Sequence, residues 1–242
     1  MMKRSQRGIL SAVLAALVPA AGGAELACGA NAPLSVATRL DYEVTATRSV
    51  LSLSGNGTVI FRRNGDAYTM ESTQQALGVL EAQQSSAGTV GRDGLMPRLF
   101  TQRSSRRPQL SVEFDWAAQR VTFSQTGESA PARPQMQDRL SLLFQLGWRQ
   151  RTEPAAGTIE VPVAVQRSAT TYLFSARGSE TLDLPAGRFK TVKYERHRGD
   201  SDDALEVWLA PALCSLPVRL RFTDDKGLVI DQQLRAVRAL AP

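Results

Sequence analysis

The stretch GTVIFRRNGDAYTM, residues 57–70, decides the fold class. Apolar and polar side chains alternate on both sides of the dipeptide Asn64-Gly65. Asn-Gly between two alternating runs predicts a β-hairpin, because both central residues of its tight turn must tolerate a positive φ. We therefore expect two antiparallel strands joined at Asn64-Gly65.

The same pattern continues outward from this hairpin. Further β-branched, aromatic or alternating runs occupy residues 38–47, 77–90, 110–116, 121–123, 158–165, 170–176, 182–184, 189–196, 205–209, 216–222 and 228–234. Short turns such as Arg92-Asp93-Gly94 separate them. We predict a mainly β protein with a strongly curved antiparallel sheet or barrel of about ten to twelve strands.

One segment breaks the strand pattern, residues 136–151 (MQDRLSLLFQLGWRQR). Its larger apolar residues recur at helical spacing: Leu140, Leu143, Phe144 and Trp148. Asp138 is a candidate N-cap, and Arg149 and Arg151 suit a helix C-terminus. The preceding residues 127–134 are rich in Pro and Ala and indicate a linker loop. We expect one capping α-helix, because its apolar stripe must be buried against the sheet.

The N-terminus has the three parts of a secretory signal. Basic residues precede the apolar run 8–21, and Gly22 and Ala24 suit a cleavage site. The run is shorter than the about 20 residues that a membrane-spanning helix needs. We predict a signal peptide at 1–24, a linker at 25–37, a single β-rich domain at 38–238, and a periplasmic protein with no transmembrane segment.

Two cysteines, Cys28 and Cys214, have two open interpretations. In an oxidising compartment they are a candidate disulfide between the mature N-terminus and a late strand, and the alternative is two unpaired thiols. Cys28 is also a candidate site of lipidation, but Glu25 stands where a lipoprotein signal carries Leu. A lipid-anchored form is therefore the less favoured alternative.

The net charge of the chain excludes few classes of function by itself. The chain has 29 basic and 23 acidic residues, a net charge of +6, and three of the basic residues lie in the predicted signal. So small a charge does not demand nucleic acid, and we predict none as a partner. One cluster of arginines is a weak candidate for binding anionic lipid, glycan or phosphate: Arg98, Arg103, Arg106 and Arg107. The alternative is a solvated edge whose charges discourage pairing.

The only histidine, His197, lies in KYERHRGDSDDALEVW, residues 193–208. A single histidine excludes H-E-x-x-H and any two-histidine metal site within one chain. The aspartates that follow it lack the spacing of a calcium loop, and no G-x-S-x-G motif is present. Glu180 and Asp183 are a conceivable carboxylate pair, but a solvated strand edge is favoured. We predict a hairpin tip at His197, no catalytic residue, no metal and no cofactor.

The C-terminal half resembles a known family. Residues 180–189 (ETLDLPAGRF), 206–211 (EVWLAP) and 216–221 (LPVRLR) are similar to the exported bacterial proteins of domain-of-unknown-function family 3108 (DUF3108). The strand at 38–44 and the helical stretch also fit, so the resemblance covers most of 38–238. It implies an antiparallel β-rich envelope protein and brings no established activity. The family often has glycine where Cys214 stands, so a disulfide there is not a family trait.

These patterns leave three functional hypotheses. Curved strands with a capping helix enclose either a packed core or an apolar cavity, and both stay open at this point. The leading hypothesis is a non-enzymatic binding or carrier protein for an apolar ligand such as a lipid, or for an envelope component. The periplasmic lipoprotein carriers are similar only at the level of the fold. The alternatives are a structural or assembly factor of the envelope and a hydrolase of envelope glycans or lipids.

Overall fold

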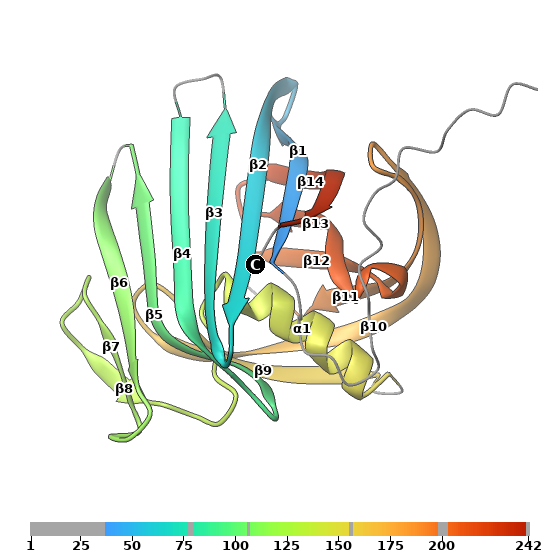
Figure 1. Ribbon diagram of the computed structural model, residues 1–242. Helices are drawn as coiled ribbons and strands as arrows, with labels where there is room; N and C mark the ends of the chain where they lie inside the picture. Colours follow the sequence, from blue (N-terminus) through green and yellow to red (C-terminus); the bar gives the residue numbers. More distant parts are fainter. Residues whose placement is uncertain (1–36, 77–79, 106, 155–156, 198–202, 241–242) are drawn as a thin grey trace, which may run out of the picture.

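The computed structural model describes residues 37–240 except 77–79, 106, 155–156 and 198–202. In this part of the chain fourteen strands form one antiparallel sheet in the order β8-β7-β6-β5-β4-β3-β2-β1-β14-β13-β12-β11-β10-β9. All neighbours except β1 and β14 are consecutive in sequence. The prediction of a mainly β, curved antiparallel sheet is confirmed, and Figure 1 shows the sheet bending around the single α-helix.

The elements follow one another along the chain as two meanders separated by the helix. They are β1 (Thr38–Arg48), β2 (Leu51–Asn64), β3 (Ala67–Ala76), β4 (Leu80–Gly91), β5 (Gly94–Ser104), β6 (Arg107–Asp115), β7 (Arg120–Phe123), β8 (Ser129–Pro131), α1 (Ser141–Thr152), β9 (Thr158–Ala164), β10 (Ala169–Leu184), β11 (Gly187–Arg196), β12 (Ala204–Ala210), the short 3-10 helix η1 (Pro211–Leu213), β13 (Leu216–Thr223) and β14 (Val229–Ala239).

The expected strand number was too low. Strand β5 was missed because its apolar residues stand in adjacent pairs, Leu95-Met96 and Leu99-Phe100, and do not alternate with polar ones, and the short strand β8 lies in the stretch interpreted as a linker. Two runs that we expected to form separate strands, 170–176 and 182–184, belong to one long strand, β10. The predicted hairpin is confirmed, but its turn lies one residue later than expected: Asn64 is the last residue of β2 and pairs with Ala67, so the central residues are Gly65, with a φ of 58°, and Asp66.

The helix begins later than predicted. Residues 136–140 are not helical, because Gln137 bonds to β9 instead: its N–H donates to the Pro162 carbonyl (2.9 Å), and its carbonyl accepts from Ala164 N–H (2.8 Å). This bridge brings the chain before α1 to the free edge of β9. A tertiary contact has therefore overridden the helical pattern at its first turn.

Asp138 caps the helix from outside its first turn. The N-cap position is Leu140, so the expectation that Asp138 occupies it was wrong. One carboxylate oxygen of Asp138 nevertheless accepts from the N–H groups of Leu140 and Ser141, both at 2.8 Å. The hydroxyl of Ser141 accepts from Asp138 N–H in return (3.0 Å). These bonds satisfy donors that the helix itself leaves unpaired.

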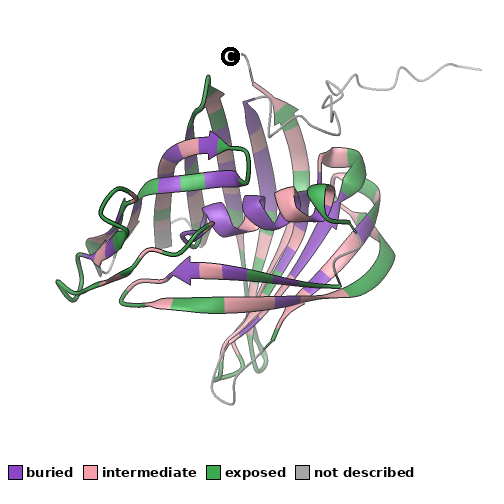
Figure 2. Ribbon diagram, turned by 90° about the horizontal axis from the view of Figure 1, so that it is seen from below, coloured by how far each residue is buried: buried purple, intermediate pink, exposed green. Residues whose placement is uncertain are grey.

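Helix α1 packs into two apolar clusters of the sheet. Phe144 stacks on Phe61 of β2, with 5.7 Å between the ring centroids, in a cluster made largely by β1–β7. Leu142 and Leu146 pack in a second cluster with β9–β13. Figure 2 shows the buried residues along α1 and on the strands around it. The described residues include no helix that is long and apolar enough to cross a membrane.

Candidate functional site

A cavity of about 640 Å³ lies between the two halves of the bent sheet. Strands β3 and β4 supply one wall, and β10–β14 supply the other. The first turn of α1 and the β9–β10 turn complete the lining. The site is thus built from segments that lie far apart in the sequence.

Part of the cavity wall is apolar because the inward row of each strand continues from the core. On β13, Leu220 and Phe222 lie two residues apart and therefore share a face. The apolar residues of the lining are Leu142, Leu143, Val165, Tyr172, Leu205, Leu220, Phe222 and Ile230. They form a surface that suits a hydrocarbon chain.

Three arginines also line the cavity: Arg139, Arg167 and Arg196. The guanidinium of Arg196 lies over the ring of Tyr172, 4.4 Å from its centroid, and donates to the carbonyl of Asp203. Its buried Nε–H has no hydrogen-bond partner among the described residues. Asp203 is the one carboxylate in the described lining. The wall therefore carries excess positive charge, which favours an anionic group.

Glutamines form the polar part of the wall. Gln74 on β3 donates to Gln232 on β14 (3.4 Å), which links the two meanders across the concave face. Gln84 on β4 and Gln166 in the β9–β10 turn both donate to the side chain of Gln102, each at 3.4 Å. These bonds are long and therefore weak.

Deeper in the barrel-like body the interior is filled. Tyr68 and Met70, on the same face of β3 as Gln74, are buried in the cluster around Phe144. The sequence left open whether the interior is packed or hollow, and the structure shows both along β3. The interior around Tyr68 and Met70 is a packed core, and the interior that Gln74 lines is the cavity.

A buried polar network lies in the packed part. The hydroxyl of Ser86 donates to the Asp138 carboxylate (2.6 Å) and contacts the hydroxyl of Tyr68 (3.0 Å). Burial raises the pKa of the Asp138 carboxyl, although hydrogen bonds from Ser86, Ser141 and Leu140 act in the opposite direction. Burial also raises the pKa of Tyr68, and the charge of Asp138 adds to this effect. All three side chains are sealed from solvent, so the network holds the helix start and offers no reacting group.

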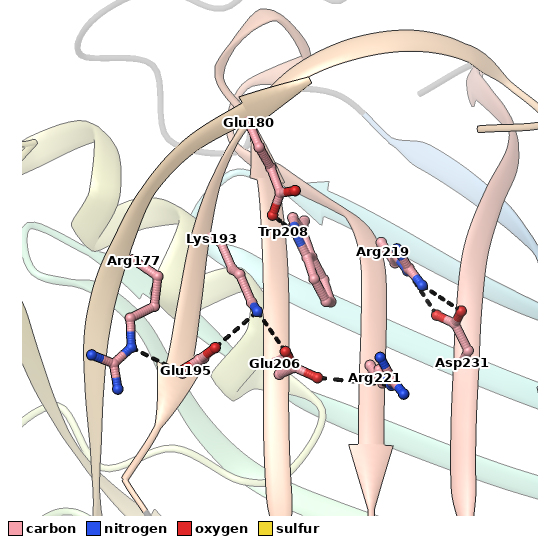
Figure 3. Close-up of polar contacts among 9 residues, drawn as sticks. All are labelled: Arg177, Glu180, Lys193, Glu195, Glu206, Trp208, Arg219, Arg221 and Asp231. Carbon is pink, nitrogen blue, oxygen red and sulfur yellow. Dashed lines mark hydrogen bonds and ion pairs between the residues drawn. The ribbon is translucent and has the colours of Figure 1, made fainter. Parts of the chain in front are cut away.

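A second polar array lies on β10–β14 (Figure 3). Lys193 binds both Glu195 (2.8 Å) and Glu206 (2.6 Å), and Trp208 lies between the cations of Lys193 and Arg219 at 5.0 and 4.9 Å from its ring centroid. The Lys193–Glu195 pair lies within β11, and the other contacts are cross-strand pairs between neighbouring strands, which stabilise pairing and register. We interpret the array as structural.

The carboxylates considered as a catalytic pair have separate partners. Glu180 accepts from the indole N–H of Trp208 (2.6 Å), whereas Asp183 forms a two-pronged ion pair with Arg188 (2.7 and 3.0 Å). The hydrogen bonds from Arg188 lower the pKa of Asp183. Glu180 therefore links β10 to β12, and Asp183 links β10 to β11.

The predicted arginine cluster and the cavity lie apart. Arg98 and Arg103 are exposed on β5, and neither is among the described residues of the cavity wall. Arg106 lies outside the described residues, and the backbone of Arg107 begins β6. The arginines that do line the cavity were missed because they come from three separate segments, and no local pattern connects them.

His197 follows β11 directly and is exposed. Its backbone N–H donates to the Leu173 carbonyl (2.7 Å), and its ring Nε2 contacts the hydroxyl of Ser175. Residues 198–202 of the expected tip lie outside the described part. Among the described residues no group of three or more His, Cys, Asp or Glu side chains is placed to hold a metal ion.

The predicted disulfide involves one described residue. The described residues include no free cysteine. Cys214 follows η1 in a left-handed conformation, with a φ of 54°, and its carbonyl accepts from Arg151 of the helix. Cys28 lies outside the described residues, as do the predicted signal peptide and most of the linker. The pairing of Cys28 with Cys214 stays a prediction.

Comparisons with known proteins agree with this architecture. A family model described as a protein of unknown function (DUF3108) matches residues 41–233. No curated protein matches the chain. A crystal structure of a β-barrel-like protein of the domain of unknown function DUF1849 from Brucella abortus is similar, with a TM-score of 0.57, 10% identity, and coverage of 85% of this chain and 98% of that chain. A DUF1329 family protein from Desulfovibrio piger is less similar, with a TM-score of 0.29, 10% identity, and coverage of 85% of this chain and 86% of that chain.

Proposed function

This chain belongs to the DUF3108 family of proteins of unknown function, and from that premise we propose that it is a binding or carrier protein for an amphiphilic envelope molecule. The ligand would have a hydrocarbon chain and an anionic group. The observation that carries this proposal is the cavity of about 640 Å³, whose lining combines apolar side chains with three arginines.

The size and chemistry of the cavity support this choice. Small-molecule sites typically measure about 300–1,000 Å³ and combine an apolar lining with a few polar groups that fix orientation. Here the apolar residues of the lining are buried or half-buried, whereas Arg139 and Arg167 are exposed. An acyl chain directed inward would leave its anionic head beside these arginines.

The predicted export supports an envelope molecule as the source. Residues 1–24 have the parts of a secretory signal, which directs a protein to the compartment where lipids and lipid-linked molecules are the abundant amphiphiles. The periplasmic location remains part of the proposal. Secretion with cleavage near Ala24, read by N-terminal sequencing of the exported protein, would support it.

Calorimetric titration with lysophospholipids tests the cavity. We expect anionic lysophosphatidylglycerol to bind more tightly than zwitterionic lysophosphatidylcholine. Ile230→Trp places a bulky ring in the cavity and should weaken binding by about tenfold or more, which corresponds to roughly 1.4 kcal/mol. Val229→Trp is the matched control, because successive residues of a strand point to opposite faces. Equal binding by the two variants would contradict the proposal.

The arginines have their own test. Arg139→Gln combined with Arg167→Gln should reduce the preference for the anionic lysolipid and leave the affinity for the zwitterionic one nearly unchanged. The control exchanges Arg98 and Arg103, equally exposed but outside the described cavity wall, for Gln. If the control pair changes the preference more than the cavity pair, the predicted arginine cluster, and not the cavity, is the anion site.

A further inference from the structure

The turn between β1 and β2 exposes aliphatic side chains to solvent. Val50 is 97% exposed, Leu51 72% and Leu53 41%. Val50 has no packing partner that explains a β-branched residue in a turn, where Gly, Asn or Asp is usual. Exposed apolar side chains that gather at one place mark an interaction site more often than scattered ones do.

These side chains continue the inner face of the sheet. Residues two apart on a strand share a face, so Leu53 and Leu51 extend the inward row of β2 that includes Phe61 and Val59. Leu53 pairs with Ala46 of β1, and Ala46 pairs with Ile230 of the cavity wall. An apolar track therefore leads from the cavity to the exposed turn.

Basic residues lie at the same end of the sheet. The strand pairings bring the β5–β6 turn, with exposed Arg103 before it, to the end where β2 begins. Thr47 pairs with Val229, so the β13–β14 turn, which carries Lys226, lies beside the β1–β2 turn. Arg48 binds Asp224 of that turn (3.2 Å). The β1–β2 turn lies at the top of Figure 1, away from α1.

We infer that this end of the sheet docks on an anionic lipid bilayer, with Val50 and Leu51 inserted at the interface and the cavity facing the membrane. A small convex aliphatic tip with basic neighbours has the composition of an interfacial anchor. Acidic Asp224 and Asp225 in the adjacent turn keep the attraction weak, which suits reversible contact. The inference goes beyond ligand binding and does not require an occupied cavity.

Vesicle flotation of the purified protein tests this surface. We expect recovery with vesicles of phosphatidylethanolamine and phosphatidylglycerol, and less with phosphatidylcholine alone. Val50→Glu with Leu51→Glu should lower the partition coefficient by about tenfold or more, because two aliphatic side chains no longer leave water. The matched control is Met96→Glu with Leu99→Glu, whose wild-type residues are exposed apolar side chains on β5. Thermal midpoints of both double variants equal to that of the wild type would show that folding is unaffected.

A tryptophan at the tip reports insertion directly. Leu51→Trp should shift its emission to shorter wavelength with anionic vesicles, whereas Leu99→Trp should not. Flotation of the tip variant at the wild-type level, or equal recovery with phosphatidylcholine, would overturn the inference. Failure of the wild type to float would also overturn it and assign the tip to a protein partner.

The two proposals fail separately. Ile230→Trp should lose lysolipid binding but float like the wild type, because the tip is intact. Loss of flotation in Ile230→Trp would overturn the docking surface as an independent site, whatever the outcome of the lysolipid titrations.

Discussion

At the scale of single residues, Asp138 shows how burial changes the role of a charged group. Its carboxylate caps α1 and binds Ser86 on β4, so it ties the helix start to the sheet. It is 0% exposed, and a buried carboxylate is tolerated only when its hydrogen bonds offset the loss of hydration. Here the effect of burial exceeds that of the bonds, and the pKa is raised.

The stability contribution of Asp138 should therefore fall as the pH rises. A carboxyl whose folded pKa is raised contributes fully below its unfolded value of about 3.9 and loses that contribution as the pH passes through the folded pKa. We expect the free energy of unfolding of the wild type, relative to Asp138→Asn, to be highest below the unfolded pKa and to decrease as the pH rises through the folded pKa. Urea titrations of both proteins over a pH series measure this difference.

The control for this experiment is Asp66→Asn, whose side chain is 86% exposed in the β2–β3 turn. Asp66 forms an exposed ion pair with Arg63 (3.5 Å), so this exchange controls for the removal of one surface carboxylate. A wild-type advantage over Asp138→Asn that grows with pH would mean that the hydrogen bonds to the carboxylate outweigh its burial.

The structural role of some residues can be predicted from the neighbouring sequence, and that of others cannot. The hairpin around Gly65 was identified correctly, although its turn is Gly65-Asp66 and not Asn64-Gly65, because a tight hairpin depends mainly on the backbone of its own few residues. The cavity arginines Arg139, Arg167 and Arg196 were not identified, because each is ordinary in its own segment. Only the folding of the sheet brings them to one cavity.

At the scale of elements, the contact between α1 and the start of β13 is unusually close. A Cβ added to Gly147 would lie 2.3 Å from the carbonyl oxygen of Ser215, a distance that requires the backbone to move. Gln150 of the same helix contacts the hydroxyl of Ser215, and Arg151 donates to the carbonyl of Cys214. The helix thus docks on this turn through a position that has no side chain.

Gly147→Ala should therefore destabilise the protein, although alanine stabilises an exposed helix by about 1 kcal/mol relative to glycine. The steric conflict should outweigh that gain and cost roughly 1–3 kcal/mol, as overpacking does elsewhere. Thermal denaturation measures the effect. Gly157→Ala, where an added Cβ meets nothing within 4 Å, is the control and should change the midpoint little. A higher midpoint for Gly147→Ala would show that α1 is free to move away from β13.

At the scale of the whole molecule, β1 and β14 join the two meanders into one sheet. Residues of β1 pair with β14 from Thr38 with Ala239 to Thr47 with Val229. The helix packs on both halves through its two apolar clusters. A continuous sheet with a shared helix should not unfold in two steps, which supports the prediction of a single domain at 38–238.

Single-tryptophan variants test this prediction. Trp116 follows β6 in the first meander, and Trp208 lies on β12 in the second. Proteins that retain only one of these tryptophans, with the others exchanged for Phe, should show coincident urea transitions by fluorescence and by circular dichroism, as two-state unfolding requires. Two separate midpoints within one variant, seen by the two methods, would contradict a single cooperative domain.

The sequence by itself determined the strand class, the tight turns, the presence of one helix and the family, because alternation and turn chemistry act between residues that are near in the chain. Only the tertiary structure decided where the helix begins, which part of the interior is filled, and which arginines meet at the cavity. These depend on contacts such as Gln137 with β9 and Gln74 with Gln232, between residues far apart in the chain. Such contacts leave no local periodicity, since each partner's segment is compatible with many neighbours until the sheet bends and selects one.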